Sequence, residues 1–71
     1  MMKAHFTGQT RDGRTVTWER GEWSGDPTLV RQADALRRDD DSMRGIATAI
    51  AAVVGADGQV SEALRQALDG D

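Results

Sequence analysis

The spacing of apolar residues changes near the middle of the chain, at the sequence Ser24-Gly25-Asp26-Pro27. Before this point apolar and polar residues alternate with a period of two, which is typical of half-buried strands. After it, apolar residues recur every three or four positions, which is typical of amphipathic helices. The sequence therefore predicts an α+β fold, in which a three-stranded antiparallel meander is followed by two or three helices packed on one face.

The first loop decides which side chains meet across the predicted sheet. We expect strands at about residues 3–10, 14–19 and 22–24. A two-residue loop at Asp12-Gly13 would mix polar and apolar residues on each face. A three-residue loop over 11–13, with Gly13 in a left-handed conformation, instead pairs Phe6 with Trp18. We therefore predict the three-residue loop.

The only three aromatic residues, Phe6, Trp18 and Trp23, are expected to form one row. A two-residue turn at Arg20-Gly21 places Trp18 opposite Trp23 on the face that carries Phe6. Base-stacking platforms flank exposed aromatic rings with Lys and Arg, whereas these rings are needed to bury the apolar stripe of the following helix. We therefore predict core tryptophans. The opposite face is expected to be solvated or available to a partner, and it carries Lys3, His5, Thr7, Gln9, Thr15, Thr17, Glu19, Glu22 and Ser24.

Helices are predicted at about residues 27–38, 42–54 and 61–69, so that residues 1–71 form a single small domain. Pro27 disfavours the helical conformation at Asp26, which suits Asp26 as the N-cap with Pro27 at the first helical position. Gly55 ends the second helix, and Ser61 is expected to cap the third.

The central helix carries apolar or small residues on nearly all sides, which predicts a buried position. Its larger side chains face the sheet. Its second face is our candidate for self-association and consists of Gly45, Ala49, Ala52 and Val53. Alternatively, helix 61–69 folds back and covers this face, leaving a monomer.

The size of the chain favours association. A domain of 71 residues without cysteine has neither disulfides nor thiolate metal ligands to reinforce a small core. Additional burial, through a homo-oligomer or a protein partner, is therefore expected.

No catalytic or metal-binding set is recognisable. His5 is the only histidine and no nucleophile and base accompany it. Asp39-Asp40-Asp41 is interpreted as a solvated link favoured by helix dipoles, and the acidic turn at 56–64 lacks calcium ligands at the required positions. We predict a protein that is not an enzyme and has no cofactor or metal.

The stretch from 46 to 68 resembles the helix-turn-helix of bacterial and phage repressors: an alanine-rich helix, a glycine turn, and valine-serine opening a second helix. Gly55 and Val60 are one position closer than is usual in that family. The resemblance implies a DNA-binding regulator whose contacts are Gln59, Ser61, Arg65 and Gln66. The net charge of −3 argues against this alternative, because binding to the phosphate backbone needs a basic face.

The leading functional prediction is a non-enzymatic interaction or assembly module, such as a phage or prophage structural or accessory protein. The chain has no signal-peptide-like start and no apolar run long enough to span a membrane. We expect it in the cytoplasm, or in a particle assembled there.

Overall fold

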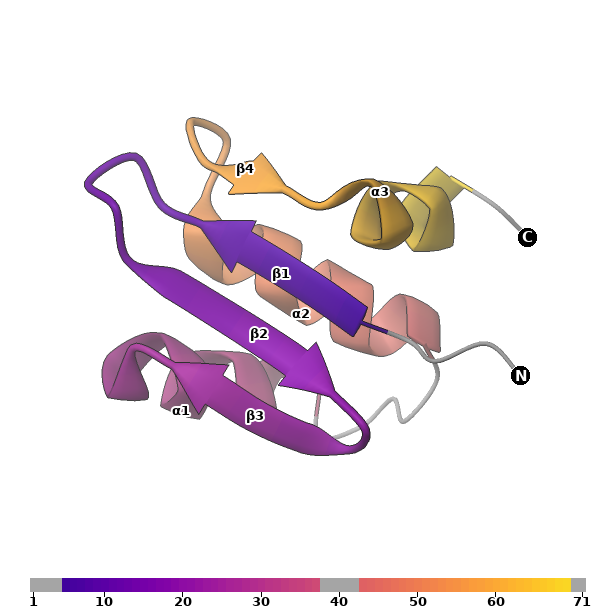
Figure 1. Ribbon diagram of the computed structural model, residues 1–71, viewed down its shortest axis with the longest axis horizontal. Coiled ribbons are helices and arrows are strands. Elements are labelled where there is room, and N and C mark those ends of the chain that lie inside the picture. The colour runs from indigo at the N-terminus through magenta and orange to yellow at the C-terminus, as the bar shows by residue number, and fades with distance from the viewer. Residues whose placement is uncertain (1–4, 38–42, 70–71) are drawn as a thin grey trace.

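The computed structural model describes residues 5–37 and 43–69, and within these ranges it shows an α+β fold (Figure 1). One antiparallel sheet has the strand order β3-β2-β1-β4. The elements in chain order are β1 (His5–Gln9), β2 (Thr15–Glu19), β3 (Glu22–Gly25), α1 (Pro27–Leu36), α2 (Met43–Val54), β4 (Gln59–Val60) and α3 (Glu62–Asp69). The predicted fold class is confirmed, with one strand more than the sequence predicted.

Both hairpins have the predicted loops and register. Phe6 pairs with Trp18, and the backbone N–H of Thr10 donates to the carbonyl of Arg14 at 2.7 Å, which leaves a three-residue loop. Gly13 has a φ of +95°, the left-handed conformation that this loop requires. In the second turn Arg20 and Gly21 both have positive φ, as a two-residue hairpin loop of the right twist demands.

The predicted aromatic row is present. Trp18 pairs with both Phe6 and Trp23, and the Phe6 and Trp18 rings stack with their centroids 6.2 Å apart. Trp18 is buried, whereas Trp23 is only half-buried because β3 is the outer strand. The indole Nε1–H of Trp23 donates to Asp34 Oδ1 at 3.2 Å, which ties the edge of the sheet to α1.

The start of α1 is as predicted. Asp26 has an extended backbone and its carboxylate accepts from the backbone N–H of Leu29 at 3.1 Å. The described part of this helix ends at Leu36, and the predicted end at about 38 and the link Asp39–Asp41 lie outside the described residues.

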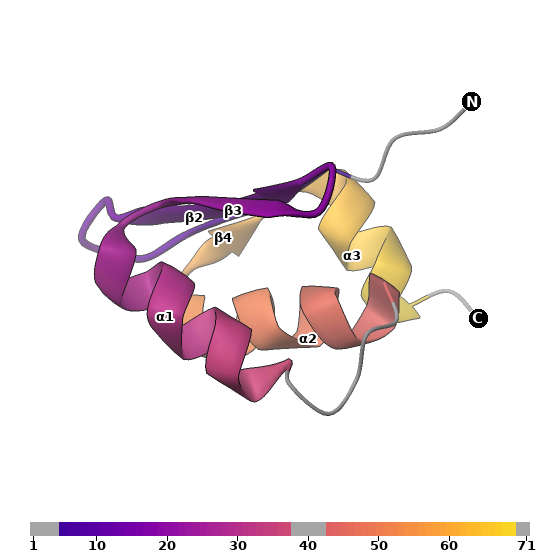
Figure 2. The ribbon, with the colours of Figure 1, turned by 90° about the horizontal axis from the view of Figure 1, so that it is seen from below.

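All three helices lie on one face of the sheet, with α2 in contact with α1 on one flank and α3 on the other (Figure 2). Leu64 of α3 is fully buried, and Ala67 and Leu68 pack against the core. Helix 61–69 therefore does cover part of the central helix. The buried core residues are Phe6, Val16, Trp18, Leu29, Ala33, Ile46, Ala47, Ala49, Ile50, Val54 and Leu64.

The fourth strand was not predicted. Gln59 and Val60 pair with Gln9 and Gly8, whereas the sequence predicted no strand between the second and third helices. A strand of two residues is too short to show an alternating pattern. Its pairing arises because the tight turn after α2 returns the chain to the free edge of β1.

Candidate functional site

An open apolar hollow lies between α1 and α2. It has a volume of about 200 Å³ and is lined by Leu36, Gly45, Thr48, Ala49 and Ala52. The four residues from α2 recur at three- and four-residue intervals, so they form one stripe along that helix. Leu36, from the last turn of α1, borders the stripe. We call this feature the Leu36 hollow.

The hollow exists because its lining residues are small. Gly45 and Ala49 are buried, and neither side chain is long enough to fill the space beside α1. Leu36 is 58% exposed, so more than half of its apolar side chain stays accessible beside this surface. Among the residues that the structure describes, no charged side chain lines the hollow, and Thr48 supplies its only side-chain hydroxyl. Its chemistry therefore suits an apolar side chain rather than an ion or a polar ligand.

Three of the four predicted self-association residues converge on this surface. Gly45, Ala49 and Ala52 line the hollow, whereas Val53 is half-buried and packs against the core. Gly45 and Ala49 are already buried within the monomer, which leaves Thr48 and Ala52 as the exposed part of the stripe.

Leu36 was not predicted as a site residue, because helical spacing places it on the apolar stripe of the first predicted helix, together with Leu29, Val30 and Ala33. Leu29 and Ala33 of that stripe are buried, as expected. The next position, Leu36, comes at the end of the helix and lacks the same cover. Helical spacing identifies a stripe but cannot tell where along the helix its covering partner ends.

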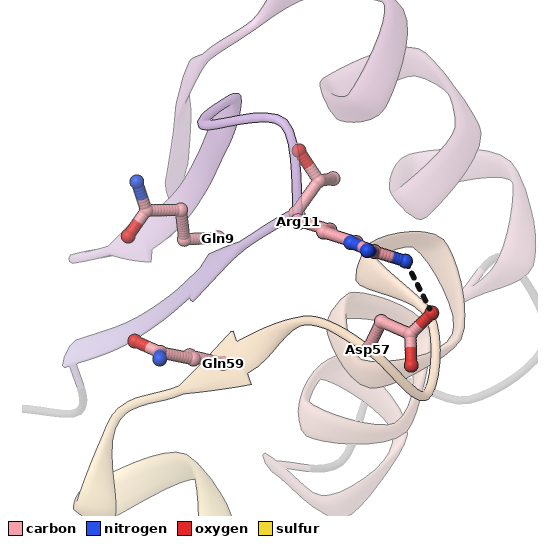
Figure 3. Close-up of a pocket in the computed structure, with 5 residues that line it drawn as sticks. Gln9, Arg11, Asp57 and Gln59 are labelled. Atoms are coloured by element: carbon pink, nitrogen blue, oxygen red, sulfur yellow. Dashed lines mark ion pairs between the residues drawn. The ribbon is translucent and has the colours of Figure 1, made fainter.

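A second, polar depression of about 310 Å³ lies where the first hairpin loop meets the turn before β4 (Figure 3). Arg11 Nη1 and Asp57 Oδ2 are 3.8 Å apart, with their side chains 84% and 76% exposed. So exposed an ion pair contributes about 0–1 kcal/mol. Gln9 and Gln59 lie side by side on β1 and β4, and both are exposed. None of the four labelled side chains is buried, and the hydroxyl of the fifth lining residue, Thr10, is already hydrogen-bonded to Asp12 and Arg14 within the loop.

The region from 46 to 68 does not form the helix-turn-helix that the resemblance implied. Between α2 and α3 the chain makes a strand, and Gln59 lies in that strand rather than on a helix. The hydroxyl of Ser61 is also already hydrogen-bonded within the domain. Its Oγ accepts from the backbone N–H of Leu64 at 3.4 Å and of Thr7 at 3.3 Å, so it caps α3 and holds it against β1.

Of the remaining predicted nucleic-acid contacts, Arg65 and Gln66 are exposed on α3. The side-chain amide of Gln66 donates to Glu62 Oε2 at 3.3 Å, which sets an acidic group beside both residues. The four predicted contacts therefore do not share one helix face. DNA binding by this surface stays the alternative hypothesis, beside the leading prediction of an interaction module.

The polar face of the sheet is organised by hydroxyl groups. His5 pairs with Glu19 across the strands, as predicted, and His5 Nε2 lies 3.3 Å from the hydroxyl of Thr7. That hydroxyl is also 3.3 Å from the hydroxyl of Thr17. Among the described residues no group of three or more His, Cys, Asp or Glu could hold a metal ion. None of the described helices is long and apolar enough to cross a membrane.

Comparison with known proteins adds no family to this description. No protein-family model, curated protein or solved structure matches the chain. A functional assignment therefore has to rest on the surfaces described above.

Proposed function

We propose that the protein is a non-enzymatic assembly module, and that it associates with a second copy of itself through the Leu36 hollow. In this proposal it works in the cytoplasm or in a particle assembled there. The observation that supports it is the position of the exposed Leu36 side chain beside a hollow lined by small, uncharged residues.

The surface is self-complementary. It carries the exposed apolar side chain of Leu36 and, next to it, a space whose described lining residues carry no charge. In a contact related by a two-fold axis each copy presents the same patch, so a residue that contacts the partner is itself contacted in return. Leu36 of each copy can then enter the hollow of the other. Small residues along α2 allow the two copies to approach closely. Because Leu36 is 58% exposed in the monomer, its burial would contribute about 1–2 kcal/mol for each side chain.

The test is the molar mass in solution of variants at the rim of the hollow. Ala52 is exposed and lines it, so Ala52→Glu introduces a charge without burying it in the monomer. The matched control is Ala63→Glu, at an exposed alanine of α3 outside the hollow. Ala52→Glu should lower the average molar mass at a given concentration, because association would bury an unpaired charge. Ala63→Glu should behave as the wild type.

Two results would count against the proposal. One is a wild-type protein that stays monomeric up to millimolar concentration. The other is an equal effect of Ala52→Glu and Ala63→Glu while both variants keep the wild-type circular dichroism spectrum. Ala49→Glu is a poor test, because Ala49 is 2% exposed and the charge would unfold the monomer itself.

A further inference from the structure

The two outer strands of the sheet differ in how much unpaired backbone they present at the edge. β4 has two residues and leads directly into α3, whereas β3 has four residues and no element lies beyond it in the sheet (Figure 1). An outer strand presents unpaired backbone N–H and C=O groups, which can pair with another strand. β3 is therefore the available edge among the described residues.

The backbone groups that face outward on β3 follow from the hairpin register. Hydrogen-bonded and non-hydrogen-bonded pairs alternate along an antiparallel ladder. The backbone N–H of Asp26 donates to the carbonyl of Thr15 at 2.8 Å, so Asp26 and Thr15 form a hydrogen-bonded pair. The alternation along the β2–β3 ladder can be counted from this pair. Ser24 then bonds to β2, and Trp23, which pairs with Trp18, directs its N–H and C=O away from the sheet.

We propose that a second copy of the chain pairs its β3 antiparallel to this edge, with Trp23 opposite Trp23 of the second copy. The two-fold axis would run perpendicular to the sheet, so that the two four-stranded sheets become one and all helices remain on the same face. The two Trp23 residues exchange a pair of backbone hydrogen bonds at the centre.

Side-chain direction selects this register. Because successive residues point to opposite faces, only every second register keeps both Trp23 rings on the helical side. With Trp23 opposite itself, Glu22 stands opposite the neutral Ser24 of the second copy. The next permitted register, with Ser24 opposite itself, sets Glu22 against Asp26 of the second copy. Like charges directly opposite are destabilising, and the Asp26 carboxylate already caps α1.

The flank of α1 beside this edge carries complementary charges. The hydrogen bond from the Trp23 indole shows that the Asp34 side of α1 faces β3. Arg31 lies three residues earlier on the same flank and is exposed, and Asp34 also pairs with Arg37 at 3.7 Å. A two-fold axis through the edge brings the two α1 helices together antiparallel, with Arg31 of each copy toward Asp34 of the other.

The contact at β3 and the Leu36 hollow do not compete, since Leu36 borders α2 and Asp34 faces β3 on the other side of α1. Two different two-fold contacts on one chain extend an assembly beyond a dimer. Strand pairing in addition to the contact at the Leu36 hollow would thus allow the protein to form assemblies larger than a dimer.

The register can be tested with cysteines, because the chain has none of its own. Glu22→Cys and Ser24→Cys change exposed side chains. In the proposed register positions 22 and 24 of different copies form a non-hydrogen-bonded pair, with Cα atoms about 4.5 Å apart, within the range that disulfides span. In a glutathione redox buffer, a mixture of the two variants should form a mixed disulfide that neither variant matches alone.

Glu22→Cys mixed with Ala63→Cys gives the level of random pairing. An amount of mixed disulfide no greater than this level would overturn the proposal. A disulfide that forms best between two Ser24→Cys chains would also overturn it, because it indicates the register with Ser24 opposite itself. Adding Ala52→Glu to both cysteine variants should leave the mixed disulfide in place. The edge contact is therefore tested separately from the hollow.

A charge pair at one position gives a second, reversible readout. Ser24→Glu places like charges opposite Glu22 of the second copy and should weaken association, whereas Ser24→Lys places opposite charges there and should strengthen it. Sedimentation of both variants at low salt should show the order Lys above wild type above Glu in average mass. The same mass for all three would contradict the pairing.

Discussion

Gly8 of β1 and Ile50 of α2 are packed so closely that a Cβ atom added to Gly8 would lie 2.7 Å from Cγ2 of Ile50. The same atom would lie 2.8 Å from Cγ1 of Val54. A glycine on the inner face of the sheet therefore allows the central helix to lie directly against β1. This contact positions α2, and with it the stripe that forms the Leu36 hollow.

We expect Gly8→Ala to lower the free energy of unfolding by about 1–3 kcal/mol, as overpacking of a filled core does. Urea denaturation followed by circular dichroism measures the loss. Val54→Ala removes one of the two clashing atoms, so Gly8→Ala should cost less in that background than in the wild type. Equal costs in the two backgrounds would show that the clash with Val54 is not the cause.

The two tryptophans should differ in both stability and fluorescence. Trp18 is 8% exposed, and Trp18→Ala should destabilise the domain by about 3–5 kcal/mol or unfold it. Trp23→Ala should cost less, because Trp23 is half-buried. In the single-tryptophan variants Trp23→Phe and Trp18→Phe, emission from Trp18 should be blue-shifted and poorly quenched by iodide, with Trp23 more accessible. Red-shifted and readily quenched emission from both tryptophans would instead favour an exposed stacking platform for a ligand.

Ser61 is expected to contribute more to the stability of the fold than its half-exposed position suggests. Ser61→Ala removes the acceptor for the N–H groups of Leu64 and Thr7, and loss of such a cap costs about 1 kcal/mol. Thermal unfolding of Ser61→Ala against Thr15→Ala, an exposed hydroxyl residue of β2 that caps no helix, measures the difference. If both variants melt at the same temperature, Ser61 does not hold α3 against β1.

Asp12 in the first hairpin loop should titrate below its ordinary range. A hydrogen bond from the Thr10 hydroxyl, and next one from the Arg14 guanidinium, lower the pKa of the Asp12 carboxyl from 3.8. Because the folded-state pKa is lowered, the associated stability is present above the unfolded-state pKa and is lost as the pH falls through the folded value. A carboxyl NMR titration should show this lowered pKa, and Thr10→Val should raise it. An unchanged midpoint in Thr10→Val would remove the hydroxyl as the main cause.

Much of the fold could be predicted because local chemistry determines it. Gly13 and the Arg20-Gly21 turn set the two registers, and Asp26-Pro27 starts α1. β4 could not be predicted, because its two residues pair only when α2 has returned the chain to β1. The same pairing is why the repressor-like stretch does not fold as a helix-turn-helix.

The candidate surface was predicted in part. Small residues on α2 indicated a face for close contact, and three of them line the hollow. Periodicity could not show that Gly45 and Ala49 are buried within the monomer, or that Leu36 stays exposed at the end of α1. Both depend on the packing of one helix against another, which a single helix pattern does not contain.

Self-assembly is tested most simply by the molar mass of the wild-type chain in sedimentation equilibrium, from micromolar to millimolar concentration. The mass should rise above 7.7 kDa with concentration, fall in Ala52→Glu but not in Ala63→Glu, and not change on addition of short duplex DNA. A mass that stays at 7.7 kDa over the whole range would contradict self-assembly, and a complex formed only with DNA would favour the regulator in its place.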